Sequence, residues 1–193
     1  MSRFDAVIAA FDAANAADPN RMRVAGLDLP KELYYGQRMT HFLMATYPDA
    51  SEALQLAARC QHIRRWESPR TDYPEGRVGY LKWRTDLKHF HARVAGEILQ
   101  AAGYDAAMVE RVGQLLRKER LKQDADVQRL EDIACLVFLE DHLGEFAPRY
   151  DSEKVVDIIR KTWKKMSAEG QQAALALDLP PAAAELVGRA LAG

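Results

Sequence analysis

The sequence predicts an all-α protein, built as a single-domain bundle of about seven or eight helices over residues 1–193. Apolar residues recur three and four positions apart along almost every segment, which is the spacing of one buried helix face. Prolines, glycines and capping residues divide these segments at lengths typical of helices. No segment alternates between apolar and polar residues as a half-buried strand does. We therefore expect helices joined by loops.

Each expected helix is bounded by residues that start or stop helices. Residues suited to open a helix mark several starts, at Pro30, Ser51, Asp105, Asp151 and Pro181. The residue before a proline is kept out of the α region, which ends three helices, at Pro19, Pro48 and Pro148. The expected helices cover about residues 4–17, 30–47, 52–66, 77–102, 106–116, 124–146, 152–166 and 181–191. The segment 170–193 is expected to be a peripheral C-terminal helix.

Composition excludes several classes of protein. A net charge of −1 and a pI near 6.5 argue against a general nucleic-acid coat and a polybasic membrane binder. No run of eighteen apolar residues is present, so no transmembrane helix is expected. The two cysteines are too few for a disulfide framework, and the start of the chain lacks the apolar stretch of a signal peptide. These features predict a cytoplasmic protein.

The helix expected over 124–146 is apolar on nearly all sides, which is typical of a central helix. It nevertheless carries Glu131 and Asp132 in its middle. A buried carboxylate without a partner costs several kcal/mol or becomes protonated. Both carboxylates should therefore meet an arginine, a histidine or a metal ion, and an internal salt bridge is the alternative to a site with chemistry.

Two histidines are candidates for an interior site. A wheel at about 100° per residue places His91 at the edge of a buried stripe and His89 on the opposite side, so His91 alone can face the interior. Gln61 and His62 lie on a helix rich in small residues, and a buried pair of this kind must be hydrogen-bonded. Asp132 and His91 are the candidate partners. A boundary histidine satisfied by a neighbour is the alternative.

The segment 59–93 is locally basic, with nine Lys or Arg against four Asp or Glu. Its net charge is therefore +5, and that of the remaining chain is −6. Arginine suits planar, bidentate binding of phosphate or carboxylate, so the segment favours a phosphate-bearing ligand. Pairing of these arginines with the acidic remainder of the chain is the alternative. The candidate phosphate-binding residues are Arg65, Arg70, Arg77, Arg84 and Lys88.

Several strings resemble a family catalogued as domain of unknown function 4202. They cover the chain as far as Ser167 and include Phe11–Pro19, Ala58–Trp66, Arg77–Arg84, Leu130–Leu139 and Lys161–Ser167, together with Pro69-Arg70 and Tyr73-Pro74. This resemblance implies a family and carries no assigned activity.

A more distant resemblance is to the helical HD superfamily of metal-dependent phosphohydrolases. The order of His41, of Gln61-His62 in place of a His-Asp doublet, of His91 and of Asp132 is similar to the order of that family's motifs. It implies an HD-like bundle in which His62 and Asp132, together with His91 or His41, bind one manganese, iron or zinc ion. The doublet lacks its aspartate, so a binuclear site is not expected.

Two functions follow as hypotheses. In the first, the protein is a metal-dependent phosphohydrolase acting on a nucleotide or small phosphate ester, with Glu131 as general base or orienting group and Arg84 stabilising developing charge. In the second, it is a non-catalytic module that binds a nucleotide, an RNA or a protein partner. Convergence of His62, His91 and Asp132 would favour the first. Side chains that point apart, or an arginine between them, would favour the second.

Overall fold

The computed structural model describes residues 2–24 and 26–192, and it confirms the all-α class. The main helices are α1 (Arg3–Ala16), α2 (Lys31–Thr46), α3 (Glu52–Cys60), α4 (Gly76–Ala101), α5 (Ala106–Arg117), α6 (Ala125–Val137), α7 (Leu143–Phe146), α8 (Ser152–Trp163), α9 (Ala168–Leu175) and α10 (Pro181–Leu191). A π-helical turn, η3 (Phe138–His142), joins α6 to α7. Three short 3₁₀ turns are η1 (Arg65–Glu67), η2 (Arg70–Asp72) and η4 (Ala147–Arg149).

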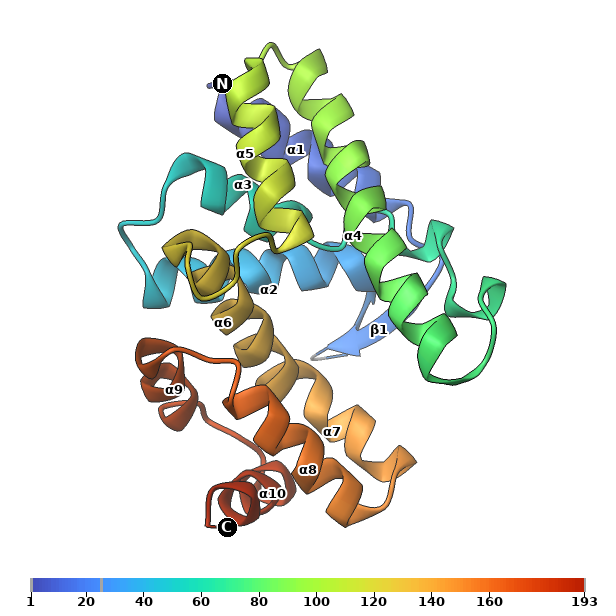
Figure 1. The fold of residues 1–193 in the computed structure, drawn as a ribbon, viewed down its shortest axis with the longest axis vertical. Helices are drawn as coiled ribbons and strands as arrows, with labels where there is room; N and C mark the ends of the chain where they lie inside the picture. Colours follow the sequence, from blue (N-terminus) through green and yellow to red (C-terminus); the bar gives the residue numbers. More distant parts are fainter. Residues whose placement is uncertain (1, 25, 193) are drawn as a thin grey trace.

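Helix α6 lies at the centre of the molecule, as its apolar pattern predicted. It contacts α2, α3, α5 and α9, and its Leu130, Ile133 and Leu136 side chains have no exposed surface. In Figure 1, α1, α3, α4 and α5 lie on one side of α6, and α7 to α10 lie on the other. The two carboxylates of α6 are therefore buried between these two groups of helices.

Helices α4 and α5 form an antiparallel pair, visible side by side in Figure 1. The chain reverses at Gly103, whose φ of +80° is a conformation that glycine adopts without a steric penalty. Asp105 then caps α5, because its side chain accepts a hydrogen bond from the N–H of Met108. This pair presents one face of α4 and the C-terminal end of α5 toward α6.

A β-hairpin was not predicted. Strands β1 (Arg21–Val24) and β2 (Leu27–Pro30) pair antiparallel around Gly26, which has a φ of +83°. Four residues per strand are too few to show an alternating pattern. Asp18 fastens the hairpin to the next helix, because its side chain accepts hydrogen bonds from the N–H groups of Asn20 and Glu32.

The third helix ends earlier than expected, at Cys60 instead of near Trp66. Arg64 has a φ of 51°, which is incompatible with a continuing α-helix, and its N–H donates to the side chain of Asn15 in α1. The segment after α3 is therefore held against α1 as a turn. This turn carries Gln61, His62 and Arg65.

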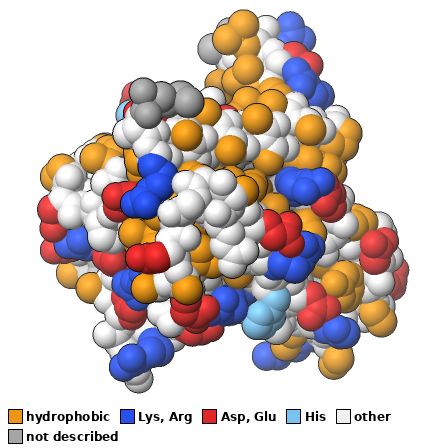
Figure 2. All heavy atoms as spheres, turned by 90° about the horizontal axis from the view of Figure 1, so that it is seen from above, with side chains coloured by type: hydrophobic (Ala, Val, Ile, Leu, Met, Phe, Trp, Pro, Cys, Tyr) orange, Lys and Arg blue, Asp and Glu red, His pale blue; other side chains and the backbone are white. Residues whose placement is uncertain are grey.

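The tail contains two helices where one peripheral helix was expected. Helix α9 packs on α6, and α10 packs on α8. Figure 2 shows acidic and basic side chains interspersed over the face seen from above, with apolar atoms between them. Within the described residues, no helix is long and apolar enough to span a membrane.

Candidate functional site

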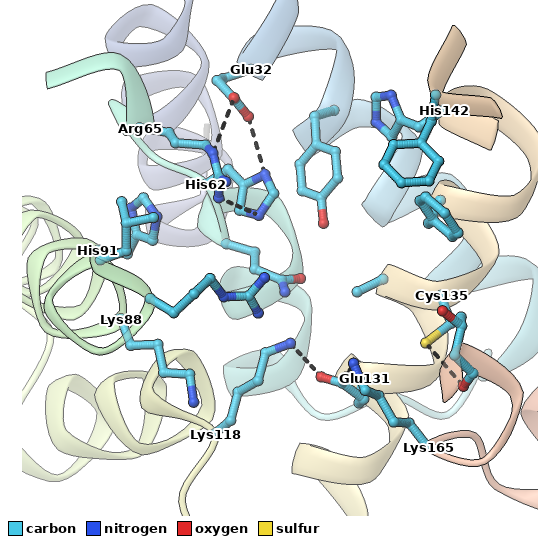
Figure 3. Close-up of a pocket in the computed structure, with 18 of the residues that line it drawn as sticks. Glu32, His62, Arg65, Lys88, His91, Lys118, Glu131, Cys135, His142 and Lys165 are labelled. Atoms are coloured by element: carbon cyan, nitrogen blue, oxygen red, sulfur yellow. Dashed lines mark hydrogen bonds and ion pairs between the residues drawn. The ribbon is translucent and has the colours of Figure 1, made fainter. Parts of the chain in front are cut away.

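A cavity of about 570 Å³ opens between α2, α4, α6 and the turn that follows α3. Its wall carries seven Lys or Arg side chains against three Glu side chains, and it also carries three histidines. The basic residues are Lys31, Arg65, Arg84, Lys88, Lys118, Arg149 and Lys165. Figure 3 shows that the charged groups come from separate elements and surround a common space. The cavity is therefore a strongly cationic pocket in a chain of nearly zero net charge.

One side of the pocket is formed by Glu32 of α2 together with His62 and Arg65. The ring of His62 stacks on Tyr35, with centroids 3.9 Å apart. Its Nδ1 lies 3.2 Å from Glu32 Oε2, and Arg65 Nη1 lies 3.3 Å from its Nε2. Because the guanidinium can only donate, His62 accepts at Nε2 and donates from Nδ1 to Glu32. Both ring nitrogens are therefore in use.

The charges of this group are set by burial. Burial, assisted by Arg65, holds the pKa of His62 well below its usual range, so the imidazole is neutral near pH 7. Burial also raises the pKa of Glu32, and the nearby Arg65 partly opposes that rise. This side of the pocket consequently presents a neutral histidine between an acid and a guanidinium.

His91 of α4 lies beside His62, with ring centroids 5.9 Å apart. Its Nδ1 is 2.9 Å from the carbonyl oxygen of Ile63, so Nδ1 carries the proton and donates. Its Nε2 and the Oε1 of Gln61 are buried, and neither has a hydrogen-bond partner within residues 2–24 and 26–192. Two buried acceptors on the same wall are a feature that calls for an explanation.

The opposite side of the pocket is formed by Lys118, Glu131 and Lys165. Lys118 Nζ donates a short hydrogen bond to Glu131, and Lys165 Nζ lies 3.9 Å from the other oxygen of that carboxylate. Burial alone would raise the pKa of Glu131, but the two lysines outweigh it and the pKa is lowered. Glu131 is therefore ionised and flanked by two cations, as shown in Figure 3.

Arg84 and Lys88 stand four residues apart on α4, so they share one helix face and point into the same space. Neither side chain forms an ion pair with a described residue. Burial and the neighbouring Lys118 and Arg84 lower the pKa of Lys88. The pocket therefore holds basic groups in excess of the acidic groups that could neutralise them.

Strained backbone lies on both sides of the pocket. Arg64, next to Arg65, has a φ of 51°, and Lys118 has a φ of 57°. A non-glycine residue in this left-handed region costs about 1 kcal/mol or more, and such strain clusters at functional sites. Arg65 and Lys118, at or next to these two positions, line the cavity.

Asp132 does not join the two histidines. Its carboxylate is completely buried and accepts hydrogen bonds from Tyr47, Gln128 and Ser167, away from the pocket. Ser167 is the N-cap of α9, so Asp132 holds that helix on α6. The expectation that Asp132 meets His91 or His62 is thus corrected, because neighbouring hydroxyl, amide and backbone groups satisfy it first.

Of the remaining predicted residues, some line the pocket and others lie outside it. Glu131, Arg65, Arg84 and Lys88 line it, together with His62 and His91. Arg70 lies outside, because its guanidinium donates to the carbonyl oxygens of Tyr73 and Pro74 and holds the loop before α4. Arg77 is exposed at the start of α4, and His41 is exposed on α2.

Four important pocket residues were not singled out from the sequence, namely Glu32, Tyr35, Lys118 and Lys165. A buried carboxylate at position 32 leaves no signal in the helical pattern, because the start of a helix commonly carries an acidic residue. The two lysines stand in segments rich in charge, where nothing distinguishes them. His142 could have been found, since it falls on the same wheel position as Glu131 and Cys135.

The donor set does not fit the metal ion that the HD resemblance implied. Within the part of the chain that the structure describes, no three His, Cys, Asp or Glu side chains are grouped to hold a metal. Both nitrogens of His62 are engaged, and Asp132 is turned away. Of the three predicted ligands, only His91 could coordinate a metal ion, through Nε2. A single imidazole does not form a chelating site.

Comparison with known proteins gives one match. The family model described as "Domain of unknown function (DUF4202)" matches residues 5–187, which is nearly the whole chain. No curated protein and no solved structure matches the chain.

Proposed function

The chain belongs to the DUF4202 family, and we propose that its cationic pocket binds a phosphorylated small molecule of the nucleotide class. The observation that carries this proposal is the excess of seven Lys or Arg over three Glu around one cavity. A dianionic phosphate would neutralise part of that excess. Arginine and lysine are the side chains that proteins use most often for this purpose.

The phosphate is expected next to Arg84 and Lys88. These residues share a face of α4, and the lowered pKa of Lys88 reflects burial and the repulsion of nearby cations. Lys118 faces them from the end of α5, although Glu131 compensates part of its charge. An anion at this point would relieve the repulsion among three cations.

The shape of the site favours a small ligand over RNA. About 570 Å³ lies within the range of pockets that hold nucleotide-sized molecules, and aromatic side chains such as Tyr80, Phe138 and Phe146 supply apolar wall. An RNA-binding stripe would need Arg65, Arg70, Arg77 and Arg84 on one exposed face. Arg65 instead lies in the pocket and Arg70 holds a loop.

We place no metal-dependent reaction in the pocket. The reason is the position of the candidate metal ligands. Asp132 is hydrogen-bonded to the N-cap residue of α9, and His62 is held between Glu32 and Arg65. His62 and His91 therefore do not converge with Asp132, and side chains that point apart favour binding over hydrolysis. Phosphohydrolase activity and an HD-like site stay predictions that this donor set does not support.

Isothermal titration calorimetry with pyrophosphate and adenosine monophosphate tests the proposal. We expect both probes to bind, and Arg84→Ala and Lys88→Ala to weaken binding about tenfold or more, as for a lost charge-assisted hydrogen bond. Lys82→Ala is the matched control, because Lys82 is on the same helix and pairs with Asp86 outside the pocket. Added salt should weaken binding. Absence of binding at millimolar concentrations, or equal losses in all three variants, would contradict the proposal.

A further inference from the structure

The pocket wall contains two acceptors to which no described residue donates a hydrogen bond. His91 is 4% exposed and Gln61 is 6% exposed, so more than nine-tenths of each residue is buried. Their Nε2 and Oε1 atoms find no partner among the described residues. A buried acceptor left alone costs about 1–3 kcal/mol, and that cost is removed when a ligand supplies the hydrogen.

The acceptor character of His91 is fixed by its surroundings. The Ile63 carbonyl oxygen 2.9 Å from Nδ1 requires the proton on that nitrogen, which leaves a lone pair on Nε2. Burial, reinforced by the neighbouring His62, lowers the pKa of His91 to about 3, so Nε2 stays unprotonated at neutral pH. A ligand group facing it must therefore donate a hydrogen bond.

The charge of the wall limits what that donor can be. Arg65 contacts His62 and lies near Glu32, and the same wall carries Arg84. A primary ammonium would be repelled by these guanidinium groups, whereas a neutral amine would not. A hydroxyl offers one hydrogen, but an exocyclic amine offers two, which matches two acceptors.

We propose that His91 Nε2 and Gln61 Oε1 accept hydrogen bonds from the exocyclic amine of a nucleobase, and so select amine-bearing over carbonyl-bearing nucleotides. This inference rests on the proposed function, because the phosphate of the same ligand lies at Arg84 and Lys88. The base then lies toward the His91 side of α4, and the phosphate lies toward Lys118, as the positions in Figure 3 allow. A carbonyl oxygen in place of the amine would set acceptor against acceptor.

Two pairs of probes differ at the amine position and carry the same phosphate. Adenosine monophosphate is compared with inosine monophosphate, and cytidine monophosphate with uridine monophosphate, by calorimetry on the full chain. We expect the amine-bearing member of at least one pair to bind at least tenfold more tightly. His91→Phe should abolish this preference and Gln61→Leu should reduce it, while pyrophosphate affinity stays unchanged in both variants.

The outcomes separate this inference from the proposed function. If pyrophosphate binds and depends on Arg84 but the paired nucleotides bind equally, or the carbonyl members bind more tightly, the inference is overturned and the phosphate site stands. A preference that survives His91→Phe also overturns it. If His91→Phe does not fold, Gln61→Leu decides, and an unchanged preference in that variant overturns the inference. If no probe binds, both proposals fail.

Discussion

The carboxylate of Asp132 accepts two hydrogen bonds from Ser167, one from the backbone N–H at 2.8 Å and one from the hydroxyl at 2.6 Å. Tyr47 and Gln128 donate two more, at 2.8 and 3.0 Å. Ser167 in turn accepts from the N–H of Gly170, which caps α9. A Cβ added to Gly170 would lie 2.6 Å from the Asp132 Cγ. Asp132 is thus the attachment point of α9 on α6.

Asp132→Asn is therefore expected to lower the free energy of unfolding by about 3 kcal/mol, because an amide nitrogen would face donors at a buried position. Urea denaturation measures this loss. Ser167→Ala should cost less, about 1–2 kcal/mol, since water or the remaining donors satisfy part of the carboxylate. Folded Asp132→Asn should bind pyrophosphate with unchanged affinity, and a loss of binding there would show that Asp132 belongs to the site.

Glu131→Gln is expected to strengthen anion binding and weaken the fold. Without the carboxylate, the charges of Lys118 and Lys165 are available to a phosphate, so pyrophosphate should bind several-fold more tightly. The same change leaves Lys118 without its ion-pair partner, at a cost of about 2 kcal/mol in stability. Calorimetry and urea denaturation on one preparation measure both effects. Weaker pyrophosphate binding would instead indicate that Glu131 acts on the ligand directly.

Acid is expected to destabilise the protein through its buried histidines. The pKa values of His62, His91 and His142 are all lowered, mainly by burial, so the unfolded chain binds more protons than the folded chain below about pH 6.5. Stability therefore falls as the pH drops below that value. With a folded pKa of about 3, His91 alone accounts for about 2 kcal/mol between pH 7.5 and pH 5.

The raised pKa of Glu32 acts in the opposite sense, since the folded chain then takes up its proton at a higher pH than the unfolded chain does. Three histidines against one carboxylate give a net loss on acidification. Urea midpoints at pH 7.5, 6.0 and 5.0 measure it. His91→Gln is the control, because glutamine does not titrate, and its pH dependence should be shallower by about 2 kcal/mol. An unchanged pH dependence in that variant would contradict the assignment.

The strain at Lys118 can be separated from its ion pair by two substitutions. Lys118→Ala and Lys118→Gly both remove the bond to Glu131, but only glycine accepts the φ of 57° and ψ of 43° at no steric cost. The glycine variant should therefore be more stable than the alanine variant by about 1 kcal/mol. Thermal or urea unfolding gives the difference. Equal stabilities would mean that the turn relaxes in both.

Local chemistry explains why much of the fold could be predicted. Ser51, Asp105 and Asp151 each accept a hydrogen bond from a backbone N–H at the start of a helix, as their positions predicted. The central place of α6 followed from its apolar surface. The hairpin at 21–30 and the early end of α3 could not be predicted, because they depend on Asp18 and Asn15, whose partners are distant in sequence.

The site could be predicted less completely than the fold, for the same reason. Helical spacing placed His91 toward the interior, and the basic segment contained Arg65, Arg84 and Lys88, all of which line the pocket. The partner of His62 is Glu32, which lies thirty residues earlier, on α2. No spacing rule connects those two positions. Asp132 is the opposite case. A carboxylate in an apolar helix is a candidate site residue from sequence alone, whether it binds a ligand or holds a helix cap.

The π-helical turn at Phe138–His142 has a consequence for the evolution of this chain. A π turn holds one residue more than an α-helical turn, and it takes up that residue within the turn itself. Deleting one residue of this turn would restore regular α winding and change the positions of Phe138 and His142, both of which line the pocket. Family members of different length in this segment are expected to keep the core and lose the wall of the pocket. A gap of one position there would therefore be a better guide to ligand binding than overall identity.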